Sequence, residues 1–339
     1  MLHSNMAKKK IKIGLVDADL LCNGTRHPNL ALLKIAGYFR DNGYVRGFTD
    51  DACCYELITN ESNFDELKKY DYFYVSCVFT FTLDCPPLVL TTLLSDKKLS
   101  KRVRMGGTGT YANKSVEEGF AEMREEDMLR LEKDSFLNSL KNRFGSYGID
   151  MQSQMPDYHL YDDFVGVMEN VKKSEKYYKD YKEYSIGFLT RGCFRRCPFC
   201  VNKLERRVLP YSKLRDFLDN EIDEKTGKLK RPYIYLWDDN FMASPDFNII
   251  LDELIATGKP FQFRQGLDMR LMTHEKAEKL ANVKYYGDYI FAFDHIEDKE
   301  LISKKLKIWR EHTHKSTKLY VLTGYDSQDE RDIENRKKI

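Results

Sequence analysis

Three cysteines stand close together in the segment TRGCFRRCPFC, residues 190–200. Three residues separate Cys193 from Cys197, and two separate Cys197 from Cys200. Clustered thiols in a chain without a disulfide pattern are typical of metal ligands or catalysts. The chemistry to explain is therefore a site with three thiolates, and only three.

The number of thiolates favours some metal groups over others. A structural zinc site has four ligands, so a histidine from elsewhere in the chain would have to complete it; the candidates are His159, His274, His295, His312 and His314. A cubane iron–sulfur cluster normally takes four thiolates, one for each iron. With three thiolates, one iron stays open to an external ligand, which suits a cluster that binds a substrate.

The loop around the cysteines is rich in positive charge. Arg191, Arg195 and Arg196 flank the thiols, and Gly192 precedes the first of them. A cluster with its thiolates and sulfides is anionic, so nearby cations and backbone N–H groups stabilise it. The local composition therefore agrees with an iron–sulfur site.

The composition sets wide limits on the rest of the protein. The 339 residues are 42% hydrophobic and 32% charged, with a net charge of +2, which favours neither nucleic acid nor a membrane as partner. No apolar run approaches the ~20 residues of a membrane span, and no signal-peptide core precedes the first strand. We therefore expect a cytoplasmic protein, with small buried roles for the other cysteines: Cys22, Cys53, Cys54, Cys77 and Cys85.

The first half alternates short apolar runs with amphipathic segments. Strands are predicted at 11–17, 44–51, 71–81 and 101–107, and helices at 29–43, 64–70 and 85–96. This alternation predicts a doubly wound parallel sheet, whose ligands would bind at the strand ends in 17–24, 76–82 and 106–111. The aromatic residues of the third strand are expected in the core: Tyr72, Tyr74, Phe79 and Phe81.

The second half alternates again. Strands are predicted at 184–190, 233–239, 260–267, 288–294 and 318–324, with helices such as 212–222 and 273–283 between them and a helix after the cysteines. Polar residues gather at the end of every strand, and the cysteines follow the first. Such a series predicts a partial parallel barrel with its site at the strand ends. The domains are therefore 1–125 and 184–339, with a charged bridging segment at 126–183 that includes exposed helices at 117–144 and 171–184.

The cysteine motif, with the aromatic Phe199 before its third cysteine, resembles that of the radical S-adenosylmethionine (SAM) superfamily. Segments 27–51 and 103–111 resemble the Rossmann-like domain of its cobalamin-binding-domain class, and LWDDNF (236–241) and VLTGYD (321–326) resemble barrel strands of that class. The resemblance implies an α/β fold: an N-terminal Rossmann-like doubly wound parallel sheet, then a partial (βα) TIM-type barrel.

The resemblance also implies an activity. Cys193, Cys197 and Cys200 would bind a 4Fe–4S cluster, which would reductively cleave SAM to a 5′-deoxyadenosyl radical that modifies a substrate. The substrate is a peptide, a nucleic acid or a small molecule, and the electron donor a protein such as flavodoxin or ferredoxin.

Further SAM-binding residues are implied by position. Phe199 would lie near the adenine, and Asp294 is the candidate for the ribose. Asp238 and Asp239 stand where the superfamily often binds the SAM amino group, and alternation along the strand would direct one of the two toward the barrel axis. The plainer alternatives are a helix cap for Asp238 and Asp239 and a turn for Asp294.

The chain departs from the class at two places. Segment DADLLCNG (17–24) lacks the histidine through which some such domains bind cobalamin, so we expect weak cobalamin binding or none. The barrel would lack its sixth strand, so either it is truncated or another chain completes it.

Two alternative functions of the chain, and the roles of two arginines, stay open. The competing functions are a cobalamin-dependent radical SAM methyltransferase and a non-enzymatic zinc or iron–sulfur binding module. Arg264 and Arg270, at the end of the third barrel strand, could bind an anionic substrate or the SAM carboxylate, but we favour structural ion pairs with Asp268 or Asp294.

Overall fold

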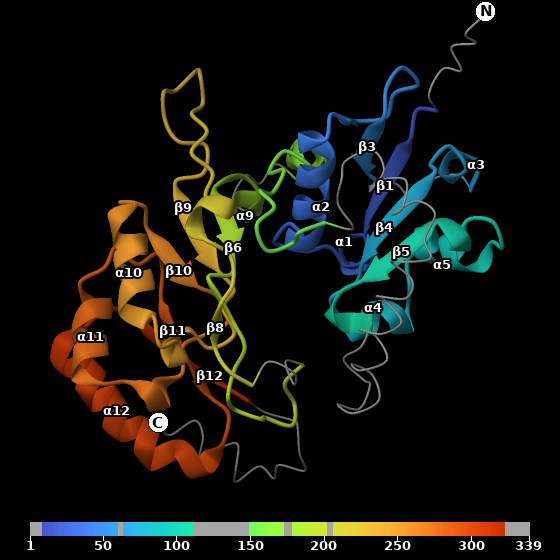
Figure 1. The fold of residues 1–339 in the computed structure, drawn as a ribbon. Coiled ribbons are helices and arrows are strands. Elements are labelled where there is room, and N and C mark those ends of the chain that lie inside the picture. Colours follow the sequence, from blue (N-terminus) through green and yellow to red (C-terminus); the bar gives the residue numbers. More distant parts are fainter. Residues whose placement is uncertain (1–8, 60–63, 111–148, 173–177, 202–205, 323–339) are drawn as a thin grey trace, which may run out of the picture. The chain divides into compact units, whose positions relative to one another are not determined.

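The computed structural model describes residues 9–59, 64–110, 149–172, 178–201 and 206–322. The chain divides into two compact units, Met1–Lys182 and Glu183–Ile339 (Figure 1). Each unit is described by itself below. No helix in the described ranges is long and apolar enough to cross a membrane.

The first unit contains a five-stranded parallel sheet with the order β2-β3-β1-β4-β5. Its strands are β1 (Lys12–Asp17), β2 (Val45–Arg46), β3 (Cys54–Leu57), β4 (Tyr72–Ser76) and β5 (Val103–Gly106). The chain runs from β1 to β2 at one edge, returns to β3 beside β1, and then crosses to β4 on the other side of β1. The carboxyl ends of β1 and β4 therefore form the switch point at which such sheets bind ligands.

Helices follow these strands as the apolar periodicity predicts. The long helix α2 (Leu30–Asp41) begins at Asn29, whose side chain accepts a hydrogen bond from the backbone N–H of Leu32 at 3.2 Å. The remaining helices of this half are shorter: α1 (Ala18–Asn23), α3 (Phe64–Leu67), α4 (Thr80–Asp84) and α5 (Leu88–Ser95).

Two predicted strands of this half have wrong bounds. Strand 44–51 is only the two-residue β2, because Gly47 turns the chain at φ 85°, and β3 lies where no strand was predicted. Strand 71–81 ends at Ser76, since the chain turns there into α4. Phe79 and Phe81 consequently lie on the surface, each 47% exposed, and their prediction as core residues is wrong.

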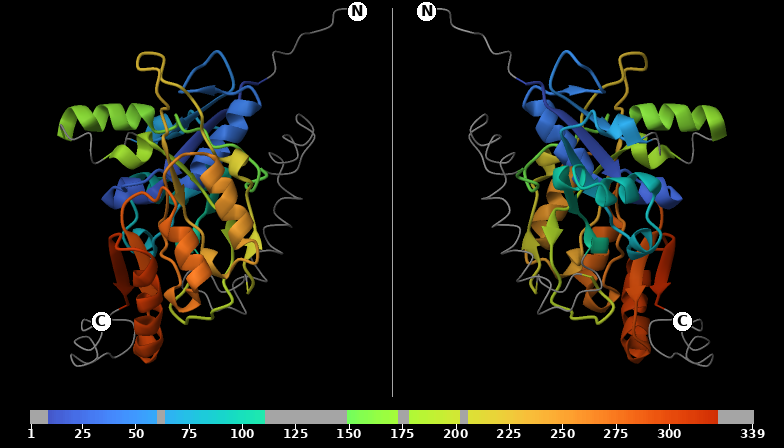
Figure 2. Two further views of the ribbon diagram at one scale, coloured as in Figure 1. Left: turned by 90° about the vertical axis from the view of Figure 1, so that its left-hand side faces the viewer. Right: turned by 90° about the vertical axis from the view of Figure 1, so that its right-hand side faces the viewer.

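The described part of the bridging segment packs on the first sheet. It forms α8 (Asp162–Lys172) and α9 (Lys179–Lys182), seen in green beside the first unit in Figure 2. Tyr161 and Tyr181 belong to the same buried cluster as Ile13 of β1 and Phe39 of α2. The predicted helix at 117–144 lies outside the described residues.

The second unit is a series of parallel strands in chain order. A three-stranded sheet joins β6 (Tyr184–Gly187), β9 (Tyr233–Leu236) and β10 (Phe261–Phe263), and β11 (Tyr289–Phe293) pairs with β12 (Thr317–Val321). A parallel bridge between Leu267 and Phe291 connects the two groups. These pairings confirm the predicted fold class, a doubly wound parallel sheet followed by a partial barrel.

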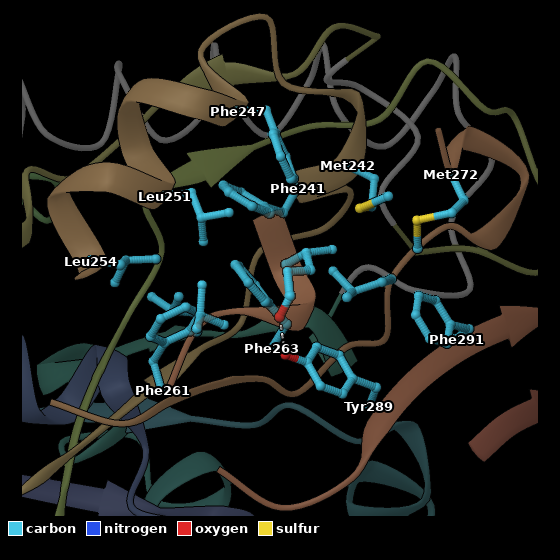
Figure 3. Packing of buried hydrophobic residues seen from close by; sticks show 14 of the residues in the cluster. Phe241, Met242, Phe247, Leu251, Leu254, Phe261, Phe263, Met272, Tyr289 and Phe291 are labelled. Atoms are coloured by element: carbon cyan, nitrogen blue, oxygen red, sulfur yellow. Dashed lines mark hydrogen bonds between the residues drawn. The ribbon is translucent and has the colours of Figure 1, made fainter. Parts of the chain in front are cut away.

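Helices follow three of these strands and cover one side of them (Figure 1). They are α10 (Phe247–Ala256), α11 (His274–Ala281) and α12 (Lys299–His312). Figure 3 shows the core between helices and strands, where Phe241 stacks on Phe263 at a centroid distance of 4.3 Å. Burying such side chains stabilises the unit by roughly 1.5–3 kcal/mol each, and this core fixes the strand ends that carry the site.

Two predicted helices of this half are not found in the described residues. Segment 212–222, the first of them, contains only a 3-10 turn, Leu214–Asp216. The second was the helix expected after the cysteines. The described residues that precede 212 instead contain the two-residue strand β8 (Leu209–Pro210), which pairs antiparallel with β7 (Thr190–Arg191). Asp216 accepts the N–H of Lys213 at 3.0 Å and Asp219 that of Glu221 at 2.9 Å. Such side-chain bonds to nearby backbone favour turns over a helix.

Candidate metal and cofactor site

The cysteine loop begins where the first barrel strand ends. Gly192 has a φ of 101°, a conformation that other residues adopt only with strain, and it turns the chain into Cys193. Cys193, Cys197 and Cys200 are all half-buried free thiols. The N–H of Cys200 donates to the carbonyl of Cys197 at 3.0 Å, which folds the second half of the loop into a turn.

Asp238 fastens the start of this loop to the end of β9. One carboxylate oxygen accepts the N–H and the hydroxyl of Thr190, both at 2.6 Å, and the other accepts the N–H of Leu189 at 3.3 Å. The side chain is buried, and burial raises the pKa of Asp238 to about 6. Both carboxylate oxygens of Asp238 are therefore hydrogen-bonded to the start of the cysteine loop.

Asp239 holds the next two residues. Its Oδ2 accepts the N–H of Gly192 at 2.8 Å and lies 3.3 Å from Nε of Arg191. The following 3-10 turn, Phe241–Ala243, has Asn240 as its first flanking residue and no side-chain cap. The alternative that Asp238 and Asp239 cap a helix is therefore wrong.

A second group of anchors comes from the end of β10. Asp268 is buried and accepts hydrogen bonds from Nε of Arg195, in the cysteine loop, and from Nε of Arg270 at 2.7 Å. Burial alone would raise the pKa of Asp268, but the hydrogen bonds from Arg270 and Arg195 outweigh it and hold this pKa below its ordinary value. The pair with Asp268 confirms the ion pair that was favoured for Arg270, which also pairs with Asp298 at 2.8 Å.

Asn240 links these two groups. Its Nδ2 lies 3.3 Å from Sγ of Cys193 and 3.3 Å from Oδ2 of Asp268. Neither Asn240 nor Asp268 was predicted from the sequence to bind a ligand or cofactor. Their position in the segments that follow β9 and β10 is the signal that could have identified them.

Asp294, at the end of β11, lies within electrostatic reach of the second cysteine. Burial raises the pKa of Cys197, the charge of Asp294 raises it further, and Arg270 opposes both. Burial likewise raises the pKa of Asp294. Phe199 lies beside His295, with ring centroids 6.0 Å apart. The structure thus gathers the predicted residues of both the loop and β11 in one region.

A pocket of about 480 Å³ opens beside this loop. Arg195, Arg196 and Arg270 supply positive charge to its wall, while Glu297 and Asp298 supply negative charge. Phe194, Cys197, Pro198 and His295 complete the lining. The pocket lining therefore carries charges of both signs next to the second cysteine.

The donor set of the loop fits an iron–sulfur cluster in kind. Sγ of Cys193 accepts hydrogen bonds from Asn240 and from the N–H of Arg195 at 3.4 Å, as an anionic cluster ligand would. Within the described ranges, no three His, Cys, Asp or Glu side chains form a group that could hold a metal ion. A structural zinc site takes four ligands, whereas each thiolate of a cubane binds a different iron, so three thiolates suit a cubane with one open iron.

The corresponding edge of the first sheet is lined by the loop that follows β4. Asp19 is buried there and accepts the N–H of Val78 at 2.7 Å and the hydroxyl of Thr82 at 2.7 Å. A Cβ at Gly107 would lie 2.2 Å from the carbonyl oxygen of Cys77, and one at Gly109 would lie 2.9 Å from that of Phe79. The glycines therefore make room for the chain's own loop after β4.

Comparisons with known proteins do not identify the function of this chain, so its assignment depends on the residues described above. No family model matches the sequence, and no curated protein matches it significantly. A search of solved structures finds a likeness to OxsB, a cobalamin-dependent S-adenosylmethionine radical enzyme with aqua-cobalamin and S-adenosylmethionine bound. Its TM-score is 0.35 and its identity 15%, over 96% of this chain and 45% of that one. The present chain spans less than half of that enzyme's length.

Proposed function

We propose that this chain is a radical SAM enzyme in which Cys193, Cys197 and Cys200 hold a 4Fe–4S cluster. One observation carries the proposal: a loop with three thiols leaves the carboxyl end of the first strand of a parallel series, and acids at the ends of the next two strands fasten it there. This is the edge at which barrels of parallel strands place their sites. When bound, the cluster would supply the electron that cleaves SAM to a 5′-deoxyadenosyl radical.

The chain's own residues would prepare the site. Asp238 and Asp239 hold residues 189–192, so that the backbone directs Cys193 away from the strand. Arg195, fixed by Asp268, contributes positive charge beside the thiolates. Because burial raises the pKa of Cys197, its thiol loses its proton when metal binds, and cluster uptake should release protons.

The remaining parts of the proposal concern partners. The substrate is a peptide, a nucleic acid or a small molecule, and an electron donor such as flavodoxin or ferredoxin would reduce the cluster. A cytoplasmic location agrees with the eight cysteines, which are all free thiols. Use of cobalamin, as in a radical SAM methyltransferase, has less support because segment 17–24 lacks the histidine through which some such domains bind it.

Alanine substitution of the cysteines tests the proposal. Cys193→Ala, Cys197→Ala and Cys200→Ala should each abolish cluster retention and SAM cleavage under a reductant, because a cubane with two protein thiolates leaves two irons unheld. Iron and zinc analysis of anaerobically reconstituted protein measures the first, and 5′-deoxyadenosine release measures the second.

The control variants are Cys53→Ala, Cys54→Ala and Cys77→Ala, which change thiols of the first unit and should affect stability only. The wild type should hold about four irons per chain, whereas a zinc-binding module would hold about one zinc. Full iron content and full cleavage activity in the Cys197→Ala variant would show that the proposed function is wrong.

A further inference from the structure

The side-chain amide of Asn240 uses its nitrogen in hydrogen bonds, whereas its oxygen has no hydrogen-bond partner among the described residues. The side chain is only 5% exposed. Its Nδ2 contacts Sγ of Cys193 and Oδ2 of Asp268, each at 3.3 Å. Its Oδ1 is buried and finds no hydrogen-bond partner among the residues that the structure describes. Buried polar atoms are nearly always hydrogen-bonded, so this oxygen needs a donor.

The chemistry of the two neighbours fixes the orientation of this amide. The nitrogen and oxygen of an asparagine side chain have similar shapes, so the hydrogen bonds must decide which is which. Asp268 is kept ionised by Arg195 and Arg270 and can only accept. A metal-bound thiolate at Cys193 can also only accept. Both contacts require the NH₂ group, and Oδ1 is therefore directed away from Cys193 and Asp268.

We propose that Asn240 is a positioning residue for the cysteine loop and for the molecule that binds beside it. Its amide N–H donates to the thiolate of Cys193, and its carbonyl oxygen accepts a hydrogen bond from an N–H or O–H group of that molecule. The inference rests on the proposed function. It assigns to Asn240 the ligand contact that the sequence placed on Asp238 or Asp239, whose carboxylates are bonded to the loop.

The two halves of this role have separate physical consequences. An N–H···S hydrogen bond withdraws charge from the thiolate and favours the more negative, reduced cluster, so its loss should lower the reduction potential. A buried carbonyl that accepts from a ligand adds to affinity, and most strongly when the donor is cationic. Substitution of a residue with only a structural role would not change the reduction potential and the ligand affinity separately.

Two substitutions separate the halves. Asn240→Asp keeps an oxygen in the place of Oδ1 but removes the N–H donor, whereas Asn240→Ala removes both groups. Asn248→Ala is the matched control, because Asn248 is exposed on α10 and its side chain donates to Glu275, in α11, at 2.8 Å. Each protein is reconstituted anaerobically and analysed for iron. The cluster potential is then measured by redox titration with EPR, and the Kd for SAM by anaerobic equilibrium dialysis.

The two Asn240 variants should both show a lower potential than the wild type, with the larger shift in Asn240→Asp because it adds negative charge. Asn240→Ala should bind SAM roughly tenfold to a hundredfold more weakly, whereas Asn240→Asp should bind at least as tightly as the wild type. Loss of iron from both variants at an unchanged melting temperature would also support the positioning role. Asn248→Ala should match the wild type throughout.

Three results would count against these claims, and they can be told apart. An unchanged potential in both Asn240 variants would overturn the donor role toward Cys193. Unchanged SAM affinity in Asn240→Ala would overturn the acceptor role. Wild-type protein that takes up no iron would overturn the proposed function itself, and with it the inference.

Discussion

Asp238 and Asp239 are neighbouring carboxylates that both reach the cysteine loop, although alternation along a strand would direct them to opposite sides. The reason is that β9 ends at Leu236, so the alternation ends before either acid. Asp238 is buried, and the pKa of its carboxyl group is about 6. Asp239 lies nearer the surface, with 20% of its side chain exposed, and contacts Arg191. Their surroundings, rather than their residue type, separate their roles.

The raised pKa of Asp238 predicts a pH-dependent stability. An aspartate in an unfolded chain has a pKa of about 3.9, so the folded state holds this proton more tightly. The resulting stabilisation is complete below about pH 4 and is lost as the pH rises through about 6. Between pH 4 and pH 7, the wild type should lose up to about 3 kcal/mol of unfolding free energy relative to Asp238→Asn, which binds no such proton.

Thermal melts of both proteins at several pH values measure this difference. Because burial also raises the pKa of Asp17, in the first unit, to about 6, only the difference between variant and wild type isolates Asp238. The melting temperature of Asp238→Asn relative to the wild type should rise from pH 4 to pH 6.5. A difference that stays constant over this range would contradict the prediction.

At the scale of elements, helix α2 holds the segment that follows the undescribed residues 111–148. The carbonyl of Leu33 accepts the N–H of Asp157 at 2.8 Å, and Nζ of Lys34 donates to the carbonyl of Met151 at 2.7 Å. The carboxylate of Asp157 in turn accepts the hydroxyl of Tyr55, in β3, at 2.7 Å. The segment predicted as a linker is therefore, in its described part, a structural layer of the first unit.

Two helical glycines test this packing. A Cβ at Gly37, in α2, would lie 1.9 Å from the carbonyl oxygen of Met155, whereas one at Gly166, in α8, would meet nothing within 4 Å. Gly37→Ala should therefore lower the unfolding free energy by roughly 1–3 kcal/mol or more, because backbone has to move. Gly166→Ala should raise it by roughly 0.5–1 kcal/mol, since alanine favours the helix.

Urea denaturation followed by circular dichroism compares the two variants with the wild type. The opposite signs are the informative result, because both substitutions add the same methyl group to a helix of the same unit. Equal effects of Gly37→Ala and Gly166→Ala would mean that residues 155–157 do not pack against α2 in solution.

At the scale of the whole molecule, the two units carry parallel strands whose carboxyl ends are used differently. In the second unit, the acids at these ends hold a loop of free thiols beside a pocket. In the first unit, the loop after β4 lies at the corresponding edge, where the N–H groups of Val78 and Phe79 donate to Asp19. The proposed function accordingly assigns the chemistry to the second unit.

This difference predicts that the chain binds cobalamin weakly or not at all. Segment 17–24 contains no histidine, and backbone of the loop after β4 occupies the space that a Cβ at Gly107 or Gly109 would need. Equilibrium dialysis with hydroxocobalamin measures the affinity, with a protein of known cobalamin affinity as the positive control. Binding at micromolar Kd or tighter would contradict the prediction and favour the methyltransferase alternative.

The sequence by itself determined the features that depend on neighbouring residues. The spacing of Cys193, Cys197 and Cys200 specifies three thiols in one loop, and local periodicity identified helices such as α2 and α11. Alternation of strands and helices was enough for the fold class, because each unit is built from consecutive elements. The helix predicted from local periodicity at 212–222 was wrong, because acidic side chains there bond to nearby backbone.

Only the tertiary structure decided what the polar residues contact. Asp238 binds residues 48 and 49 positions away, and Asp268 binds Arg195 from 73 positions away. Sequence patterns report periodicity over a few residues, whereas these partners are chosen by how strands and loops pack in space. For the same reason, the sequence offered Asp238 and Asp239 as ligand residues, and the packed structure bonded them to the loop and left the carbonyl oxygen of Asn240 unpaired.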